Sequence, residues 1–306
     1  MSVQKIKTKK ISWTHIHKAT RKEIEFIGDE YKFHKLDLED CLVRVQRPQI
    51  SQYHNYLFFI LTFPVYNRHT KEIESSEIDF FVGAKYVITF SDGLNPVVND
   101  FFQELQNNIQ SQDLYMSGFQ VNLVYEILHR LQTHTLPMLD HVSEDIEDVE
   151  KRIFKGEEQK VVREILNIKR NIVNLRKIMQ AHKNIIKKLM DAKNRFFMPD
   201  QTNLYFSNIL DRTKDIWDIL ETQKENINAF QETNESLITN KTNDIMKILT
   251  VISVVIIPAN LIASIFGMNA KQMPLVNGPY DFFIILSIMI CMIMSFLIFF
   301  RKKGWL

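Results

Sequence analysis

Polar and small side chains recur at intervals of three and four residues in an otherwise apolar stretch near the C-terminus, which places them on one face of a helix. With the apolar residues on or near that face, the set is Asn243, Met246, Leu249, Thr250, Ser253, Ile257, Asn260, Ser264 and Gly267. No Asp or Glu occurs between Asp244 and Asp281. A neutral lining of amides and hydroxyls suits a cation that keeps its water, as Mg2+ tends to do. The pattern therefore predicts passage of a hydrated ion, with Met246, Leu249 and Ile257 as an apolar constriction.

Two long apolar segments must position this stripe. Residues 245–266 contain Lys247 as their only charge, and residues 282–300 contain none. Each is close to the ~20 residues that a helix needs to cross about 30 Å of hydrocarbon. We predict two transmembrane helices joined by a short external loop, 267–281. Pro258 is expected to bend the first helix near its middle.

A polar stripe inside a membrane needs an explanation, because lipid offers it no hydrogen bonds. One explanation is a pore in which several copies of the chain turn their stripes toward a shared lumen. The other is a packed helix–helix interface, where small polar residues are common. Asn243 and Asn260 favour the pore, because each amide has four hydrogen-bonding positions to satisfy. The stripe fixes an axis but no copy number.

Basic residues flank the two spans on one side of the membrane. Lys241 and Lys247 stand at the start of the first span and a basic run, 301–303, follows the second, whereas the loop contains only Lys271. The positive-inside rule predicts a multi-pass membrane protein with both termini in the cytoplasm. The cell (inner) membrane is the expected location, and another inward-facing membrane is the open alternative. Two cysteines in 306 residues agree with a reducing compartment, and no signal peptide is expected.

Residues 1–115 are predicted to form an N-terminal α/β cytoplasmic domain. Apolar runs rich in β-branched and aromatic residues are typical of buried strands, and they occur at 56–61, 77–82 and 86–90. Asn95 and Pro96 precede an expected helix.

Residues 116–242 change to a helical period and are predicted to form a hairpin and a stalk helix. One apolar series runs from Leu139 to Ile153, and Gly156 ends that helix. A second series keeps a heptad spacing: Val161, Ile165, Ile168, Ile172, Leu175, Met179, His182, Ile186 and Leu189. After Pro199 and Asp200 a third helix is expected from near Gln201 into the transmembrane domain, 243–306.

Two charged surfaces belong to this helical part. The first helix has an acidic patch, made of Glu144, Asp145, Glu147, Asp148 and Glu150. The second is basic, with Lys169, Arg170, Arg176, Lys177, Lys183, Lys187, Lys188, Lys193 and Arg195. Solvated faces and ion pairs between helices are the favoured interpretation. The alternative is an electrostatic field near the mouth of the pore.

Composition and motifs argue against two other classes of protein. The net charge is +2, from 38 basic and 36 acidic residues, so a dedicated nucleic-acid binder is not expected. No phosphate-binding glycine loop, nucleophile elbow or metalloprotease motif occurs, and the histidines are scattered. An enzyme anchored to the membrane is therefore disfavoured.

The tripeptide Gly267-Met268-Asn269 directly follows the first span and precedes a short loop, a second span and a basic tail. This arrangement resembles the CorA family of magnesium transport proteins, the Gly-Met-Asn motif metal ion transporters. Residues 242–250 and Pro258 are similar to the family's pore helix. Residues 38–41, 47–50 and 56–58 are similar to its N-terminal domain, so the resemblance covers nearly the whole chain.

The resemblance implies an α+β cytoplasmic domain, a long helical bundle or stalk, and two C-terminal transmembrane helices in a funnel-shaped homopentamer embedded in lipid. Gly267, Met268 and Asn269 would form the selectivity filter at the outer mouth. Asn243 would ring the cytoplasmic end, and Asn260 would form an inner polar ring. Mg2+ would be both transported and regulatory, with no organic cofactor.

Two departures from the family pattern concern charge. The residues after the tripeptide, 270–275, are not acidic, so the outer mouth is less negative. Asn208 falls where relatives often have an acidic regulatory ligand. By the resemblance, the remaining candidates for the regulatory metal are Asp211, one helical turn beyond Asn208, and Glu232.

The leading hypothesis is potential-driven influx of Mg2+, with Co2+ and Ni2+ as lesser substrates. A proton-coupled Zn2+ transporter of the same superfamily is the nearest alternative, although a pore without titratable carboxylates counts against it. A membrane-anchored coiled-coil scaffold would explain the heptads and leave the asparagines unexplained.

Overall fold

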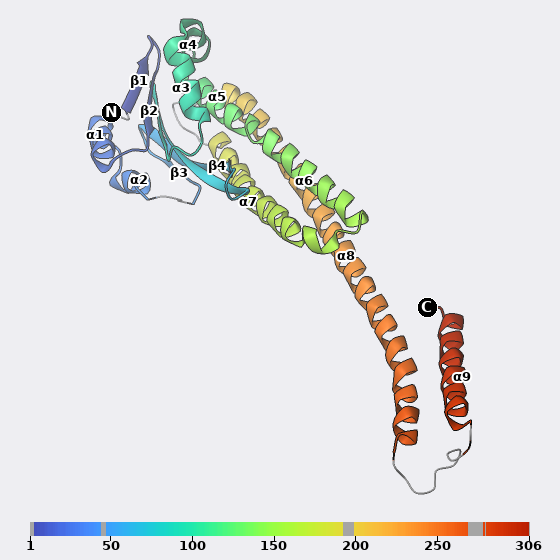
Figure 1. Ribbon diagram of the computed structural model, residues 1–306. Coiled ribbons are helices and arrows are strands. Elements are labelled where there is room, and N and C mark those ends of the chain that lie inside the picture. The colour runs from blue at the N-terminus through green and yellow to red at the C-terminus, as the bar shows by residue number, and fades with distance from the viewer. Residues whose placement is uncertain (1–2, 44–46, 192–198, 269–277, 279, 306) are drawn as a thin grey trace. The chain divides into compact units, whose positions relative to one another are not determined.

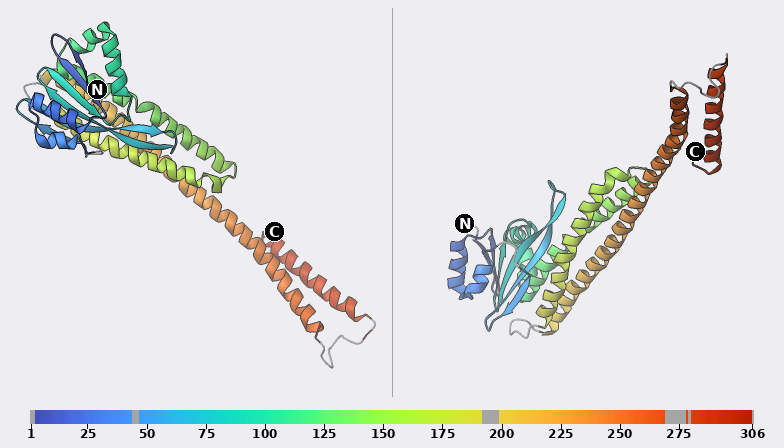
Figure 2. Two further views of the ribbon diagram at one scale, coloured as in Figure 1. Left: turned by 60° about the vertical axis from the view of Figure 1, so that its left-hand side comes forward. Right: turned by 90° about the horizontal axis from the view of Figure 1, so that it is seen from below.

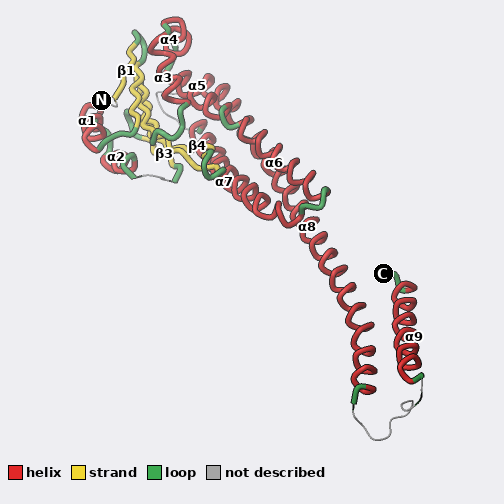
Figure 3. Tube along the Cα trace, in the orientation of Figure 1, coloured by secondary structure: helices red, strands yellow, loops and turns green. Residues whose placement is uncertain are grey.

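The computed structural model describes residues 3–43, 47–191, 199–268, 278 and 280–305, with the backbone alone for 199–202 (Figure 1). The chain divides into two compact units, Met1–Gln231 and Glu232–Leu306. The strands all lie in the first unit, and both segments predicted to cross a membrane lie in the second (Figure 3).

The first unit is built on a six-stranded sheet with the order β1-β2-β6-β5-β4-β3. Its strands are β1 (Val3–Lys7), β2 (Ser12–His17), β3 (Gln49–Gln52), β4 (Tyr56–Asn67), β5 (Glu72–Gly83) and β6 (Tyr86–Ser91). Neighbouring strands are antiparallel, except that β2 and β6 are parallel. The three predicted strands correspond to β4, β5 and β6, and β4 and β5 are longer than predicted.

The sequence predicted that this strand ends at residue 61, but β4 continues through Pro64 to Asn67. Strand β3 pairs only with residues 57–60 of β4, so the remainder of β4 has a ladder partner on one side alone. A proline lacks the N–H that a second ladder would need, and a strand segment with one partner tolerates it.

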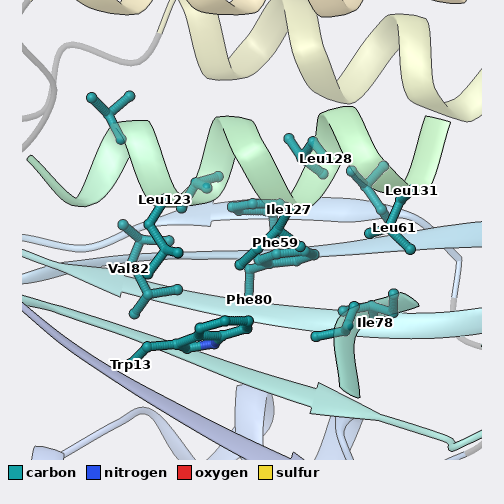
Figure 4. Packing of buried hydrophobic residues seen from close by; sticks show 14 of the residues in the cluster. Trp13, Phe59, Leu61, Ile78, Phe80, Val82, Leu123, Ile127, Leu128 and Leu131 are labelled. Carbon is teal, nitrogen blue, oxygen red and sulfur yellow. The ribbon is translucent and has the colours of Figure 1, made fainter. Parts of the chain in front are cut away.

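Helices cover both faces of the sheet, which explains why the central strands are apolar without alternation. Helices α1 (Arg21–Tyr31) and α2 (Lys35–Asp40) lie on one face, where Ile24 packs with Phe58 and Phe81. The other face meets α3 (Val97–Asn107), α5 (Gln120–Thr133) and α7 (Glu158–Met190). Figure 4 shows the sheet residues Phe59 and Phe80 packed against this second layer.

The helical bundle of this unit consists of α5 and three longer helices, α6 (Leu136–Phe154), α7 and the first part of α8 (Pro199–Phe266). Helix α4 (Ile109–Met116) leads into α5, and α6 and α7 run antiparallel as a hairpin (Figures 1 and 2). Gly156, with a φ of 89°, follows the end of α6 as predicted. Every residue of the predicted heptad series on α7 is buried. Helix α8 begins at Pro199, two residues before the predicted start near Gln201. Proline is well suited to the first turn of a helix.

Polar contacts fix the part of α8 that belongs to the first unit. Gln132 on α5 donates to the Ile209 carbonyl at 3.2 Å and to Thr213 Oγ1 at 2.8 Å. Gln223 on α8 donates to the Leu139 carbonyl of α6 at 2.8 Å. These buried amides set the register between α8 and its neighbours.

The second unit contains the end of α8 and helix α9 (Asp281–Lys302). The two helices lie side by side and run in opposite directions (Figures 1 and 2). Among the described residues, two helices are long and apolar enough to cross a membrane, 203–266 and 281–302. They contain the two predicted spans.

Candidate functional site: a polar face on a membrane helix

The predicted stripe lies on the exposed side of α8. Met246, Leu249 and Ile257 are 55%, 56% and 65% exposed, which is unusual for apolar side chains without a partner. The polar members Asn243, Thr250, Asn260 and Ser264 are exposed as well, and Ser253 is half-buried. The predicted pore-lining residues therefore share one face of α8 that is largely exposed within one copy, as are other faces of this segment, for example at Ile245 and Leu261.

The opposite side of the same helix segment is covered. Within the predicted span, 245–266, Val251 and Ala259 are the buried residues of α8, and Phe300 is the buried residue of α9, within the described part of the chain. At about 100° per residue, Val251 and Ala259 lie across the helix from the centre of the stripe. The helix is therefore packed within the copy at these two positions, and most of its surface, the stripe included, is left for lipid, water or other copies.

Hydroxyls and amides on the stripe differ in how they are satisfied. Thr250 Oγ1 donates to the Met246 carbonyl at 2.7 Å, and Ser253 Oγ donates to the Leu249 carbonyl at 2.9 Å. Asn243 and Asn260 have no hydrogen-bond partner within the described residues. Two amides without a partner in an apolar helix must be satisfied by water, an ion or another copy.

Proline and glycine shape the helix beyond this point. Helix α8 is continuous across Pro258, whose missing N–H frees the Val254 carbonyl. At Gly267 the backbone N–H donates to the Ala263 carbonyl at 2.9 Å, and an added Cβ would meet that same oxygen at 3.0 Å. The close approach favours glycine at the first residue of the tripeptide. Met268 is 62% exposed, and Asn269 lies outside the described residues.

A cavity of about 470 Å3 adjoins the start of the stripe within the second unit. It is lined by residues of α8 and by the C-terminal tail: Asn240, Asn243, Asp244, Met246, Lys247, Thr250 and Trp305. Gly304 adopts a φ of 70°, after which the Trp305 N–H donates to the Phe300 carbonyl at 3.1 Å. The Trp305 ring then stacks on Phe300, with 5.7 Å between centroids. Asn240 and Trp305 were not predicted as site residues, although the Gly-Trp pair after a basic run was visible in the sequence.

The two predicted regulatory residues are 21 positions apart in the sequence and belong to different units of the chain. Asp211 is exposed on α8 in the first unit, and Glu232 is exposed at the start of the second. Asn208, in the place of an expected acidic ligand, accepts a hydrogen bond from Tyr125 Oη at 3.2 Å. No group of three His, Cys, Asp or Glu side chains that could hold a metal occurs among the described residues of one copy.

Asp37 and His182, two buried titratable groups of the first unit, have hydrogen-bond partners inside the fold. Asp37 accepts hydrogen bonds from Tyr56 Oη at 2.7 Å and from Tyr53 Oη at 3.1 Å, and burial raises the pKa of its carboxyl. Burial also raises the pKa of Asp79 well above its usual value. The His182 ring donates from Nε2 to the Thr62 carbonyl at 2.6 Å, and burial lowers its pKa to about 4. His182 is a structural histidine at a position of the predicted heptad series.

A soluble α/β domain, a long helix and two C-terminal apolar helices with a polar face on the first define a membrane transport protein for ions. The family described as CorA-like Mg2+ transporter protein matches residues 8–302. The chain belongs to this family of divalent-cation transporters. The family is one of transporters, in line with the expectation that the chain is not an enzyme.

Relatives and solved structures agree with this family assignment. The chain is 26% identical over 296 residues to the cobalt/magnesium transport protein CorA of Thermotoga maritima, covering 97% of this chain and 83% of that protein. Its fold matches the structure of the CorA magnesium transporter from Methanocaldococcus jannaschii with a TM-score of 0.82 at 20% identity, over 98% of this chain and 94% of that one. The predicted fold class is confirmed by that match.

A more distant likeness concerns the first unit. The cytoplasmic domain of ZntB from Vibrio parahaemolyticus matches with a TM-score of 0.62 at 12% identity, over 76% of this chain and 90% of that one. This likeness is one of fold alone.

Proposed function

We propose that the chain conducts hydrated Mg2+ into the cell, driven by the membrane potential, through a pore formed by five copies in the cell (inner) membrane. Both termini lie in the cytoplasm in this proposal. The observation that supports it most is the open stripe of α8, where Asn243 and Asn260 have no partner among the described residues of their own copy. Copies arranged around an axis would give these amides water and a passing ion as partners.

The stripe residues have distinct roles in this proposal. Asn269 lines the outer mouth with Gly267 and Met268, and its amide binds water of the hydrated ion. Met246, Leu249 and Ile257 form an apolar constriction that closes by losing its water. Thr250, Ser253, Asn260 and Ser264 supply neutral oxygens along the lumen. A lining without carboxylates passes Mg2+ with its water and accepts Co2+ and Ni2+ as further substrates.

Cytoplasmic Mg2+ gates the pore in the same proposal. Carboxylates are suitable ligands for Mg2+, and Asp211 and Glu232 are exposed. In this proposal the regulatory ion binds between two copies, as the family resemblance implies, and Asp211 and Glu232 are its candidate ligands. An ion held between copies would favour the closed arrangement of the pore. Loss of that ion would allow the pore to open.

The test is Mg2+ uptake into liposomes that contain the purified full chain, under an inward-negative potential. We expect Asn269→Ala to reduce the flux at least about tenfold, since the filter loses the amide that binds the ion's water. Asn107→Ala, which removes an exposed asparagine of the first unit, is the matched control and should leave the flux unchanged. Size-exclusion chromatography verifies that each variant keeps the oligomeric state of the wild type.

The same liposomes separate the alternatives. Equal flux in wild type and Asn269→Ala would contradict the filter assignment, and no flux in either would favour the scaffold. Zn2+ uptake that follows an imposed pH gradient in place of the potential would favour the proton-coupled transporter.

A further inference from the structure

A second cavity, of about 470 Å3, lies in the first unit between α7 and α8. Its volume falls in the range of small-molecule sites, roughly 300–1,000 Å3. The residues that line it on α7 are spaced by three and four, and so share one helix face, which runs from Lys169 to Gln180. None of the roles proposed for the ion pathway uses this cavity.

The rim of the cavity has an excess of positive charge. Lys169, Arg176 and Lys177 contribute from α7 and Lys224 contributes from α8. Arg176 and Lys224 share one carboxylate, that of Glu221, with Lys224 Nζ at 3.2 Å. Four cations therefore face one paired anion.

Two of the lysines are free to bind an anion. Lys169 Nζ donates to the neutral side chain of Gln231 at 2.5 Å, so its charge is not compensated. Lys177 is exposed and has no ion-pair partner among the described residues. Since lysine ammonium groups act as point charges toward phosphate, these two are suited to a polyanion.

Besides its charges, the cavity offers a flat aromatic surface, apolar side chains and the two amides of Gln180 and Asn228. The Arg176 guanidinium lies over the Trp217 ring at 4.7 Å from its centroid. Ile172 and Ile227, each 1% exposed, form the floor. Aromatic rings and guanidinium planes are surfaces on which nucleic-acid bases stack.

We propose that this cavity binds a nucleoside polyphosphate, with the base against Trp217 and Arg176 and the phosphates toward Lys169, Lys177 and Lys224. Inorganic phosphate would leave the ring and the apolar floor without a partner. An acyl chain would use the floor, but it has no need for the flat cationic and aromatic surfaces. The nucleotide is the class that uses both the charge and the flat apolar surface.

Isothermal titration calorimetry of the full chain in detergent tests the proposal, with EDTA present so that the nucleotide is free of metal. The probes are ATP, adenosine and tripolyphosphate. We expect saturable ATP binding, with adenosine and tripolyphosphate each at least about tenfold weaker, because each keeps only one half of the contacts.

Three variants locate the site. Lys177→Glu should weaken ATP binding about tenfold or more. Trp217→Leu should weaken ATP binding about tenfold and leave tripolyphosphate binding unchanged. Lys188→Glu makes the same charge change at an exposed lysine of α7 outside the cavity, and it should alter ATP binding less than about twofold.

Several outcomes would overturn the proposal. These are no saturable binding of ATP, tripolyphosphate binding as tight as ATP, or equal weakening by Lys177→Glu and Lys188→Glu. Because Lys177 is exposed, its variant is expected to keep the wild-type melting temperature, which verifies that a loss of binding is not a loss of folding. The readout is independent of transport, so failure of the pore proposal would not affect it.

Discussion

The two units of this chain treat polar side chains in opposite ways. In Met1–Gln231, several buried polar side chains find partners within the copy: Asn171 accepts from the Ile73 N–H at 2.9 Å, and His182 donates to the Thr62 carbonyl. In Glu232–Leu306, Asn243 and Asn260 lie exposed on a largely apolar helix with no partner among the described residues. The polar groups named in the first unit are satisfied within one chain, whereas the two asparagines of the second require water, ions or further copies as partners.

The largest expected effect tests whether the first unit is complete by itself. Phe80 is fully buried and stacks on Phe59, with 4.5 Å between centroids (Figure 4). Phe80→Ala should lower the free energy of unfolding of this unit by about 3–5 kcal/mol, since a cavity remains in a closed core. Denaturant unfolding followed by the fluorescence of Trp13, in the same core, measures it.

The control is Phe26→Ala, at a residue that is 64% exposed, which should change the free energy by less than about 0.5 kcal/mol. Both transitions should be independent of protein concentration. A midpoint that rises with concentration would contradict the view that this unit is stable without other copies.

How far the sequence predicts this unit depends on how strongly each element is patterned. The apolar runs predicted the positions of β4, β5 and β6, and the heptad series predicted the buried face of α7. Strands β1, β2 and β3 were not predicted. Strands β1 and β3 are short edge strands in which half or more of the positions are lysine or glutamine, which protects a sheet edge but hides the strand in the sequence.

Strand β2 was missed for another reason. Its inner positions include Thr14 and His15, which are buried although they are polar. His15 Nδ1 lies 2.9 Å from Thr89 Oγ1 of the parallel strand β6, and this partner becomes adjacent only when the sheet forms. A pattern of hydrophobicity cannot reveal a polar pair that the tertiary fold creates.

In contrast to β2, most of the candidate site could be predicted from the sequence. The spacing of polar residues predicted which side chains share a face of α8, because helix geometry alone decides it. Trp305 joins the cavity beside Asn243 through a turn at Gly304, and no helical spacing predicts that contact. The assignment of this face as a pore and the three-part domain division remain predictions.

A smaller effect sharpens the comparison through pH. Burial lowers the pKa of His182 to about 4 from 6.5, so the folded chain keeps the ring neutral where the unfolded chain protonates it. Its contribution to stability is therefore complete above pH 6.5 and is lost as pH falls toward 4. At pH 5 the loss should be about 2 kcal/mol.

His182→Gln tests this, because the amide can still donate to the Thr62 carbonyl and does not titrate. The difference in free energy of unfolding between wild type and variant should shrink by about 2 kcal/mol between pH 8 and pH 5. A difference that is constant with pH would show that the ring does not remain neutral in the folded unit.

The smallest expected effect tests the second unit, where one side of α8 is open and the other is covered. In a background with Cys41→Ser and Cys291→Ser, we compare Ser264→Cys, on the exposed stripe, with Ala259→Cys, which is 8% exposed. A cationic thiol reagent added to liposomes should reduce Mg2+ flux about tenfold in Ser264→Cys, because a fixed positive charge in a narrow lumen repels the ion. It should leave Ala259→Cys unaffected, since that side chain faces the packed side of the helix.

Equal inhibition of the two variants would mean that the stripe is not the lumen, and inhibition of Ala259→Cys alone would place the pathway on the side of α9. In that case the exposed asparagines would be satisfied by packing between copies, and the face of α8 that carries Ala259 would line the ion pathway.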